Sequence, residues 1–403
     1  MHESSFSLSA ASRVLEMVSV APAPTLVCFS HLRWNFVFQR PQHLLTRAAR
    51  DYRVLFVEEP VHEDVAPRLA LREELGGVIV AVPVLPHGLD ASAAEDLQRR
   101  LIDGVLEEAA RPLVFWYYTP MALGFTAQYQ PDVCVYDCMD ELSAFRFAPP
   151  KLAERERELF TKADLVFTGG ESLFEAKRNR HPSVHAFPSS IDAPHFARAR
   201  LESAADPGDQ AAIPHPRIGF FGVIDERMDL DLLAAAADLR PSWHFVMIGP
   251  VVKIKEADLP RRANIHWLGG KTYDALPDYL AGWDLGFMPF AINESTRYIS
   301  PTKTPEFLAA GLPVVSTPVI DVVRSYGTAG LVEIAADARS TVAKAELLLR
   351  QARGPWQERV DRALGRTSWD GTWAEMNALI EEKLDEGILP HGLEAKAKAA
   401  AHV

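Results

Sequence analysis

The sequence has few of the features that mark several classes of protein. It contains only three cysteines in 403 residues, Cys28, Cys134 and Cys138, each in or beside an apolar run. So few thiols exclude a disulfide-built domain and indicate a reducing compartment. Cys134 and Cys138 are four residues apart, but no second Cys/His pair accompanies them, which argues against a zinc site.

Long apolar runs and an excess of basic residues are also absent. No run is long enough to span a bilayer. Residues 1–22 lack a basic segment followed by a continuous apolar core, so we predict no signal peptide and a cytoplasmic protein. Acidic residues outnumber basic ones by 54 to 42, for a net charge of −12. This charge argues against nucleic-acid binding, which depends on neutralising phosphates, but it does not exclude a small basic pocket for one phosphorylated ligand.

Familiar catalytic and cofactor motifs are missing. Neither G-x-S-x-G nor H-E-x-x-H occurs, and the adjacent Gly169 and Gly170 do not form a G-x-G-x-x-G dinucleotide motif. Asp229 and Asp231 form D-x-D, but they open a helical pattern in which residues two apart point to different faces. We therefore expect no metal and no resident cofactor.

What the sequence does have is a regular alternation of short apolar runs and helical patterns. Runs rich in Val, Ile, Leu and Phe are typical of strands buried on both faces of a parallel sheet. The predicted strands are 25–30, 52–57, 77–82, 112–118, 132–137 and 164–170 in the first half, and 217–222, 243–249, 264–270, 284–290 and 312–317 in the second. The helical patterns include 40–50, 150–163, 229–239, 274–282 and 304–310. Two such series predict an α/β fold of two doubly wound, Rossmann-like domains.

The stretch ESAADPGDQAAIPHP, residues 202–216, is typical of a linker between the two domains. The predicted boundaries are an N-terminal extension (1–22), an N-terminal domain (23–203), a linker (204–216), a C-terminal domain (217–355), a helical segment (356–388) and a flexible tail (389–403).

Several predicted strands end in residues suited to a binding site. Gly222 and Gly249 follow strands of the second half, and Asp137 ends one of the first. Ligands of parallel α/β sheets bind outside the carboxyl ends of the strands. The sequence therefore predicts a ligand cleft between two facing domains.

The stretch SPTKTPEFLAAGLPVVST, residues 300–317, places a helix start at this cleft. Thr304 is predicted as the N-cap, with Pro305 at the first helical position and Gly311 ending the helix.

Lys303 and Glu306 give this helix start a chemical character. Free N–H groups and a lysine suit a diphosphate, and a glutamate can accept hydrogen bonds from a ribose diol. The alternative is that Lys303 is solvated and Glu306 merely favours the helix dipole; the position facing the cleft favours a nucleoside diphosphate site.

These residues resemble the nucleotide-sugar signature of GT-B glycosyltransferases of the "group 1" class. In that class a Lys or Arg and a Glu precede a helix, and an A-x-G-x-P-V-V run follows. The stretches FVFQRPQHLL, VYDCMDELSAF, DLVFTGGESLFEAKR, FPSSIDAPHF, FFGVIDERMDLDLL and FVMIGP resemble a bacterial branch of cell-surface polysaccharide synthesis, such as the teichuronic-acid type. The resemblance spans about residues 25–330.

The resemblance implies a set of donor-binding residues. They are Gly222, Arg227, Gly249, Pro250, Leu268, Gly269, Thr302, Lys303, Thr304 and Glu306. Lys303 and Arg227 would hold the diphosphate, with Gly222 allowing it close to the backbone. One position departs from the class, because Tyr298 stands where a second glutamate is usual.

Candidate acceptor-side residues follow strands of the first half. Asp140 is the candidate base for an inverting reaction, which needs a group to take the acceptor's proton. Asp137 and Arg40 are candidates for acceptor contacts, and Trp34 for stacking on a sugar. For the two aspartates, capping the next helix or binding Arg146 is an equal alternative, and for Trp34 it is packing.

The resemblance implies a metal-independent glycosyltransferase that moves a sugar from a nucleotide-sugar, UDP-linked by expectation, to a saccharide or lipid-linked acceptor. It leaves open peripheral contact with the inner face of the cytoplasmic membrane. A nucleotide-sugar epimerase and a non-catalytic scaffold of the same fold remain alternatives, the latter because of Tyr298.

Overall fold

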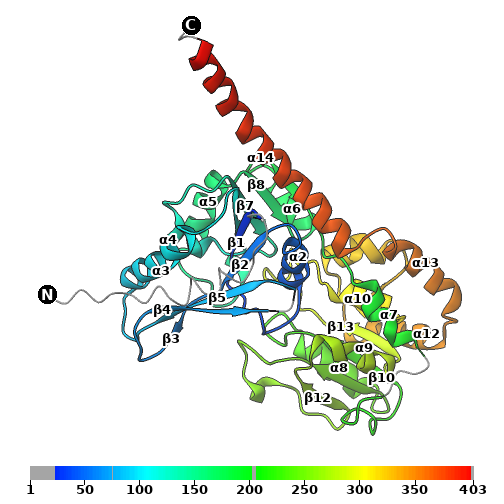
Figure 1. Ribbon diagram of the computed structural model, residues 1–403. Helices are drawn as coiled ribbons and strands as arrows, with labels where there is room; N and C mark the ends of the chain where they lie inside the picture. Colours follow the sequence, from blue (N-terminus) through cyan, green and yellow to red (C-terminus); the bar gives the residue numbers. More distant parts are fainter. Residues whose placement is uncertain (1–22, 75, 202–205, 401–403) are drawn as a thin grey trace.

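The chain forms two α/β domains joined at the side by a long helix (Figure 1). The computed structural model describes residues 23–74, 76–201 and 206–400, and their side chains up to residue 386. The predicted fold class is confirmed, and the predicted extension 1–22 lies outside the described residues.

The N-terminal domain is built on a nine-stranded sheet in the order β3-β5-β2-β1-β6-β7-β8-β9, with β4 paired antiparallel to β5. Its strands are β1 (Thr25–Phe29), β2 (Arg53–Val57), β3 (Val61–His62), β4 (Arg68–Glu73), β5 (Ile79–Leu85), β6 (Leu113–Tyr117), β7 (Val133–Cys138), β8 (Leu165–Thr168) and β9 (Val184–Ala186). Its helices are α2 (Arg40–Ala48), α3 (Ala91–Leu106), α4 (Leu123–Thr126), α5 (Leu152–Lys162) and α6 (Glu171–Lys177). The sequence analysis missed β3, β4 and β9, which are short or carry charged residues.

The C-terminal domain has a six-stranded parallel sheet in the order β12-β11-β10-β13-β14-β15. The strands are β10 (Arg217–Phe221), β11 (His244–Ile248), β12 (Ile265–Gly269), β13 (Leu285–Met288), β14 (Val314–Ser316) and β15 (Glu333–Ile334). The helices that follow are α8 (Leu230–Leu239), α9 (Leu276–Ala281), α10 (Lys303–Ala309), α11 (Ile320–Val322), α12 (Ala338–Arg350) and α13 (Gly354–Leu364). Of these six strands, only the two-residue β15 was not predicted.

The boundary between the domains lies earlier in the chain than predicted. Helix α7 (Ala193–Ala197) packs on α10, and its Phe196 belongs to the core of the C-terminal domain. Gln210, in the predicted linker, is fully buried; it donates to the Tyr279 carbonyl at 3.0 Å and accepts from the Trp283 indole at 2.7 Å. The linker segment 206–216 is therefore part of the C-terminal domain.

The last helix, α14 (Trp369–Ala400), returns to the N-terminal domain (Figure 1). Trp369, Trp373, Met376 and Ile380 are buried in that domain's core. The division predicted at residue 389 is wrong, since the helix continues to Ala400; residues 401–403 lie outside the described part. Among the described helices none is both long and apolar enough to cross a membrane.

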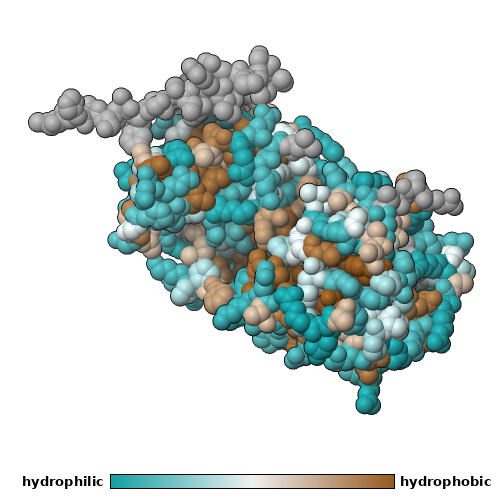
Figure 2. Space-filling model, turned by 90° about the horizontal axis from the view of Figure 1, so that it is seen from below, coloured by the Kyte–Doolittle hydropathy of each residue, from teal (hydrophilic) through white to brown (hydrophobic). Residues whose placement is uncertain are grey.

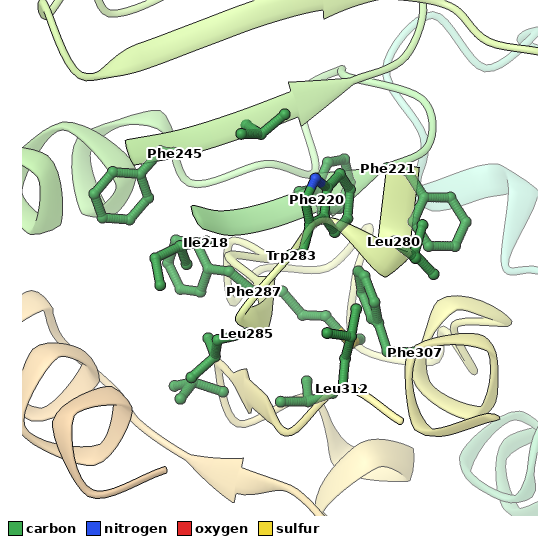
Figure 3. Packing of buried hydrophobic residues seen from close by; sticks show 14 of the residues in the cluster. Ile218, Phe220, Phe221, Phe245, Leu280, Trp283, Leu285, Phe287, Phe307 and Leu312 are labelled. Atoms are coloured by element: carbon green, nitrogen blue, oxygen red, sulfur yellow. The ribbon is translucent and has the colours of Figure 1, made fainter. Parts of the chain in front are cut away.

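An aromatic core fixes the strand ends of the C-terminal domain (Figure 3). The Trp283 ring covers Gly219 of β10 so closely that a Cβ there would overlap it. Phe221, at the end of β10, meets Phe307 of α10 edge to face with ring centroids 5.0 Å apart. This contact holds the start of α10 against the carboxyl end of β10.

Candidate functional site

A cleft open to solvent lies between the domains. Its walls come from the carboxyl ends of β7 and β8 in the N-terminal domain and of β10 and β13 in the C-terminal domain, together with the start of α10. A contiguous hollow extends past Gly249 and Pro250. In the space-filling view, apolar surface gathers in the middle of the molecule, between its two halves (Figure 2).

Helix α10 begins earlier than predicted. Thr302 is the N-cap and Lys303 the first helical residue, so Pro305 is at the third position. Thr304, predicted as the N-cap, is fully buried and its hydroxyl lies 3.5 Å from the Met288 sulfur. A cap at 302 turns Lys303 toward the end of β10.

Lys303 lies directly over Gly222. Gly222 has φ +132°, and a Cβ on it would overlap the end of the lysine side chain. Gly249 has φ +151°, and a Cβ there would overlap the Gly222 carbonyl oxygen. The two glycines thus bring two backbones and an ammonium group together. Burial lowers the pKa of Lys303, although the nearby Glu306 partly opposes this.

Glu306 faces the same cleft one helical turn later. Its side chain is 7% exposed, and burial raises its pKa from 4.5 to about 7 despite Lys303. Tyr273, which also lines the cleft, has a buried hydroxyl without a hydrogen-bond partner among the described residues. Burial, and then the charge of Glu306, raises the pKa of that phenol. The cleft thus holds an acid and a phenol that both favour their neutral forms.

Arg227 reaches the cleft but is already paired. Its guanidinium bonds both carboxylate oxygens of Asp225, at 2.7–3.1 Å. Its cationic carbon also lies 5.3 Å from the ring centroid of Phe145, which belongs to the N-terminal domain. Desolvation lowers the pKa of Arg227, but the hydrogen bonds and charge of Asp225 outweigh it, so the pKa is raised.

Asp140 lies in the cleft just after β7. Burial raises its pKa from 3.8 to about 6, against the opposing charges of Arg227, Arg40 and Lys303. No hydrogen bond to its carboxylate is found among the described residues, so neither alternative, helix capping or pairing with Arg146, describes it.

Arg40 and Asp137 form a buried ion pair. The guanidinium donates to both carboxylate oxygens at 2.9 and 3.0 Å, and to the Phe187 carbonyl at 2.8 Å. The side chains are 3% and 0% exposed. Asp137 therefore lies beneath the cleft with both carboxylate oxygens bonded to Arg40, and not to Arg146 as the alternative foresaw. Arg40 forms part of the cleft wall.

The other predicted residues divide into those at the cleft and those away from it. Gly249 and Pro250 line the second hollow, together with an edge of Trp34, whose ring packs on Phe56 in the core. Leu268 is partly buried against the core, and neither it nor Gly269 lines either hollow.

Sequence reasoning missed two aromatic residues of the cleft. Phe38 stacks on Tyr273 with centroids 4.4 Å apart, joining the two domains. Tyr273 in turn stacks on His195 at 4.2 Å. No local pattern marks these residues, because their partners come from distant segments.

Tyr298, at the position where the class has glutamate, is partly buried against the N-terminal core. Arg297 lies over its ring, 5.3 Å from the centroid. The residue therefore contributes an apolar contact between domains and no carboxylate.

Comparisons with known proteins agree with this architecture. The family model "Glycosyl transferases group 1" matches residues 215–351. Residues 215–351 form a group 1 glycosyltransferase domain. A Bacillus subtilis (strain 168) protein named "Putative teichuronic acid biosynthesis glycosyltransferase TuaH" is 27% identical over 224 residues, 50% of this chain and 54% of that protein. The chain thus matches about half the length of this curated relative.

Solved structures extend the likeness in fold to both domains. Sucrose-phosphate synthase from Thermosynechococcus elongatus superposes with a TM-score of 0.65 at 13% identity, over 89% of this chain and 99% of that one. Anabaena HepE, solved with UDP and glucose, gives 0.65 at 14% identity over the same shares. At such identities the likeness shows the fold, which is GT-B.

Proposed function

We propose that the protein transfers a sugar from a UDP-linked donor to a saccharide or lipid-linked acceptor in bacterial cell-surface polysaccharide synthesis. The group 1 domain supports the reaction type. The name of the Bacillus relative supports the pathway, and the UDP found in the HepE structure supports the base. The observation on which the proposal rests is Lys303 lying over Gly222, with Glu306 facing the same cleft.

Each of these groups has a role with a donor bound. The ammonium of Lys303 would meet the diphosphate, which the absence of a Cβ at Gly222 lets approach the backbone. An anion there would favour the charged lysine, whose pKa is lowered in its absence. Glu306 would bond the ribose hydroxyls.

Departure of the diphosphate needs positive charge, because the leaving group becomes more negative in the transition state. Lys303 would supply it, helped by Arg227 if the arginine exchanges part of its bonding from Asp225 to phosphate. We propose that these two side chains act in place of a metal.

Asp140 would act as the base if the reaction inverts the anomeric configuration. Its raised pKa of about 6 leaves most of it ionised at pH 7, with a proton affinity greater than that of an ordinary aspartate. A retaining reaction needs no such base. The anomeric configuration of the product decides between these mechanisms.

The test is thermal unfolding with UDP, GDP, ADP and dTDP, for the wild type and for Lys303→Ala combined with Glu306→Ala. A nucleotide at about a hundred times its dissociation constant stabilises the native state by about 2.7 kcal/mol. We expect UDP to raise the melting temperature of the wild type and not that of the double variant. Lys344→Ala, on α12 and paired with Glu333, is the control and should respond as the wild type does.

Two outcomes would contradict the proposal. If no nucleotide stabilises the wild type, the non-catalytic scaffold becomes the better hypothesis. If UDP binds but a UDP-sugar is converted to another nucleotide-sugar without any acceptor, the protein is an epimerase.

A further inference from the structure

The loop between β7 and α5, residues 139–151, reaches across the cleft and contacts the C-terminal domain. The backbone N–H of Arg146 donates to Glu226 at 3.2 Å, and its guanidinium donates to the Lys253 carbonyl at 3.3 Å. The side-chain ammonium of Lys253 in turn lies 3.5 Å from the Glu226 carboxylate. The loop is therefore bonded to two separate segments of the other domain, one after β10 and one after β11.

Phe145 places an aromatic ring between two cations of the C-terminal domain. Its centroid is 5.3 Å from the Arg227 guanidinium carbon and 4.9 Å from the Lys253 ammonium. Both distances suit cation–π attraction, which strengthens where water is excluded. Leucine could fill the same space but would not attract the cations.

The backbone is strained on both sides of this contact. Phe147 has φ +66° and Lys253 has φ +62°, and within the described residues no other non-glycine residue has a positive φ. Such conformations persist only where surrounding contacts hold them, and they cluster at ligand clamps and switches. Phe147 is also 74% exposed, so packing in a core does not stabilise its conformation.

The same loop contains Asp140, five residues before Phe145. Asp140 lines the cleft among the charges of Arg227, Arg40, Lys303 and Asp225, which come from both domains. Its position relative to Arg227 and Lys303 thus depends on where the loop docks.

We propose that Phe145 and Arg146 are positioning residues: they dock the β7–α5 loop on Arg227, Glu226 and Lys253, and so hold Asp140 beside the groups that bind the donor. The proposal rests on the function proposed above, because it concerns the relation of Asp140 to that site. In this docked position Phe145 also covers Arg227, which is paired with Asp225.

Trypsin cleavage after Arg146 tests the docking. Phe145→Leu removes the ring but keeps an apolar side chain. Phe145→Tyr keeps the ring and is the control; Phe147 is left unchanged, because its ring lies 4.9 Å from the Arg146 guanidinium carbon. We expect Phe145→Leu to be cut about tenfold faster, as loss of the two cation–π contacts implies, and Phe145→Tyr within about twofold of the wild type. Cleavage of Phe145→Leu at the wild-type rate would overturn the proposal.

The pH dependence of unfolding tests whether docking positions Asp140. The pKa of Asp140 in the folded protein, about 6, lies above its ordinary 3.8, so the native state loses stability as the pH rises through this window. Phe145→Leu should make this loss of stability smaller than it is in the wild type. In the Asp140→Asn background Phe145→Leu should have no such effect on the pH dependence, because the carboxylate that titrates is absent and the contributions of other groups cancel in the comparison. An unchanged pH dependence in Phe145→Leu would show that the loop does not position Asp140.

Stabilisation by UDP, measured on the same variants, separates the two proposals. Phe145→Leu should still respond to UDP, with the response reduced at most by the share that Arg227 contributes, because Lys303, Gly222 and Glu306 are untouched. A wild type that does not respond to UDP contradicts the proposed function, while the trypsin and pH results still decide the docking.

Discussion

Lys303 and Glu306 are two ionisable side chains that burial pushes toward their neutral forms. The pKa of the lysine is lowered and that of the glutamate is raised to about 7, although each charge favours the other. This arrangement is costly, because neither charge is well solvated. A ligand that brings a diphosphate to the lysine and hydroxyls to the glutamate would relieve that cost.

Replacing Glu306 should therefore stabilise the protein at high pH when no nucleotide is added. Its pKa of about 7 in the folded state exceeds the ordinary 4.5, so the native state binds more protons than the unfolded one and stability falls as the pH rises from about 4.5 to 7. The full effect, present above pH 7, is about 3 kcal/mol. Glu306→Gln should melt at a higher temperature than the wild type at pH 8, and the two should differ little at pH 4.5.

The control for this titration is Glu294→Gln, since that carboxylate is 78% exposed. It should follow the wild type across the whole range. Equal pH dependence in the wild type and Glu306→Gln would mean that Glu306 is not the group that titrates. If its ribose role also holds, Glu306→Gln should lose affinity for UDP while gaining stability.

At the scale of elements, the carboxyl end of β10 and the start of α10 form one unit. Phe221 and Phe307 pack the two together, and Lys303 lies over Gly222 as a result. Gly222→Ala places a Cβ at φ +132°, at a cost of about 1–3 kcal/mol, and pushes the lysine aside.

We expect Gly222→Ala to unfold at lower denaturant concentration and to lose stabilisation by UDP. Gly354→Ala is the matched control, because its φ is not positive and nothing lies within 4 Å of the added Cβ. Unchanged UDP binding in Gly222→Ala would show that the backbone approach at this glycine is not needed.

Elements built from local apolar runs were predictable, and those that depend on partners were not. Strands such as β1, β10 and β11 are buried along nearly their whole length, and their sequences carry no charged or polar residue after the first position. Strand β4 reads RLALRE and is partly exposed at the sheet edge, where pairing with β5 replaces burial. The start of α10 was misplaced because its Thr302 cap makes no side-chain hydrogen bond that a capping rule could anticipate.

The site was predictable only in part, for the same reason. Lys303, Glu306 and Gly222 meet because strand ends of one sheet gather at one edge. Arg40 and Asp137 are 97 residues apart, and nothing near either one in the sequence indicates the buried pair. The Phe145 contact with Arg227 crosses between domains, so it depends on how the domains face each other.

The whole molecule is held together by α14, which follows the C-terminal domain in the chain but completes the core of the N-terminal one. Helix α14 packs on α2 and β7, and its Trp369, Trp373 and Met376 belong to the N-terminal core that includes residues of β1. The last helix thus stabilises the N-terminal domain, and the chain crosses between the domains twice, between β9 and α7 and between α13 and α14.

Met376→Ala tests this second connection. Met376 is 0% exposed, and its truncation should cost about 2–5 kcal/mol. Because its neighbours belong to the N-terminal core, hydrogen exchange should quicken in β1 and β2 and not in β10 and β11. Leu347→Ala, 67% exposed on α12, is the control and should change neither. Faster exchange in the C-terminal sheet alone would show that α14 stabilises the domain it follows in the chain. If the helix completes the N-terminal core, Met376→Ala should still be stabilised by UDP, because the Lys303 site lies in the other domain.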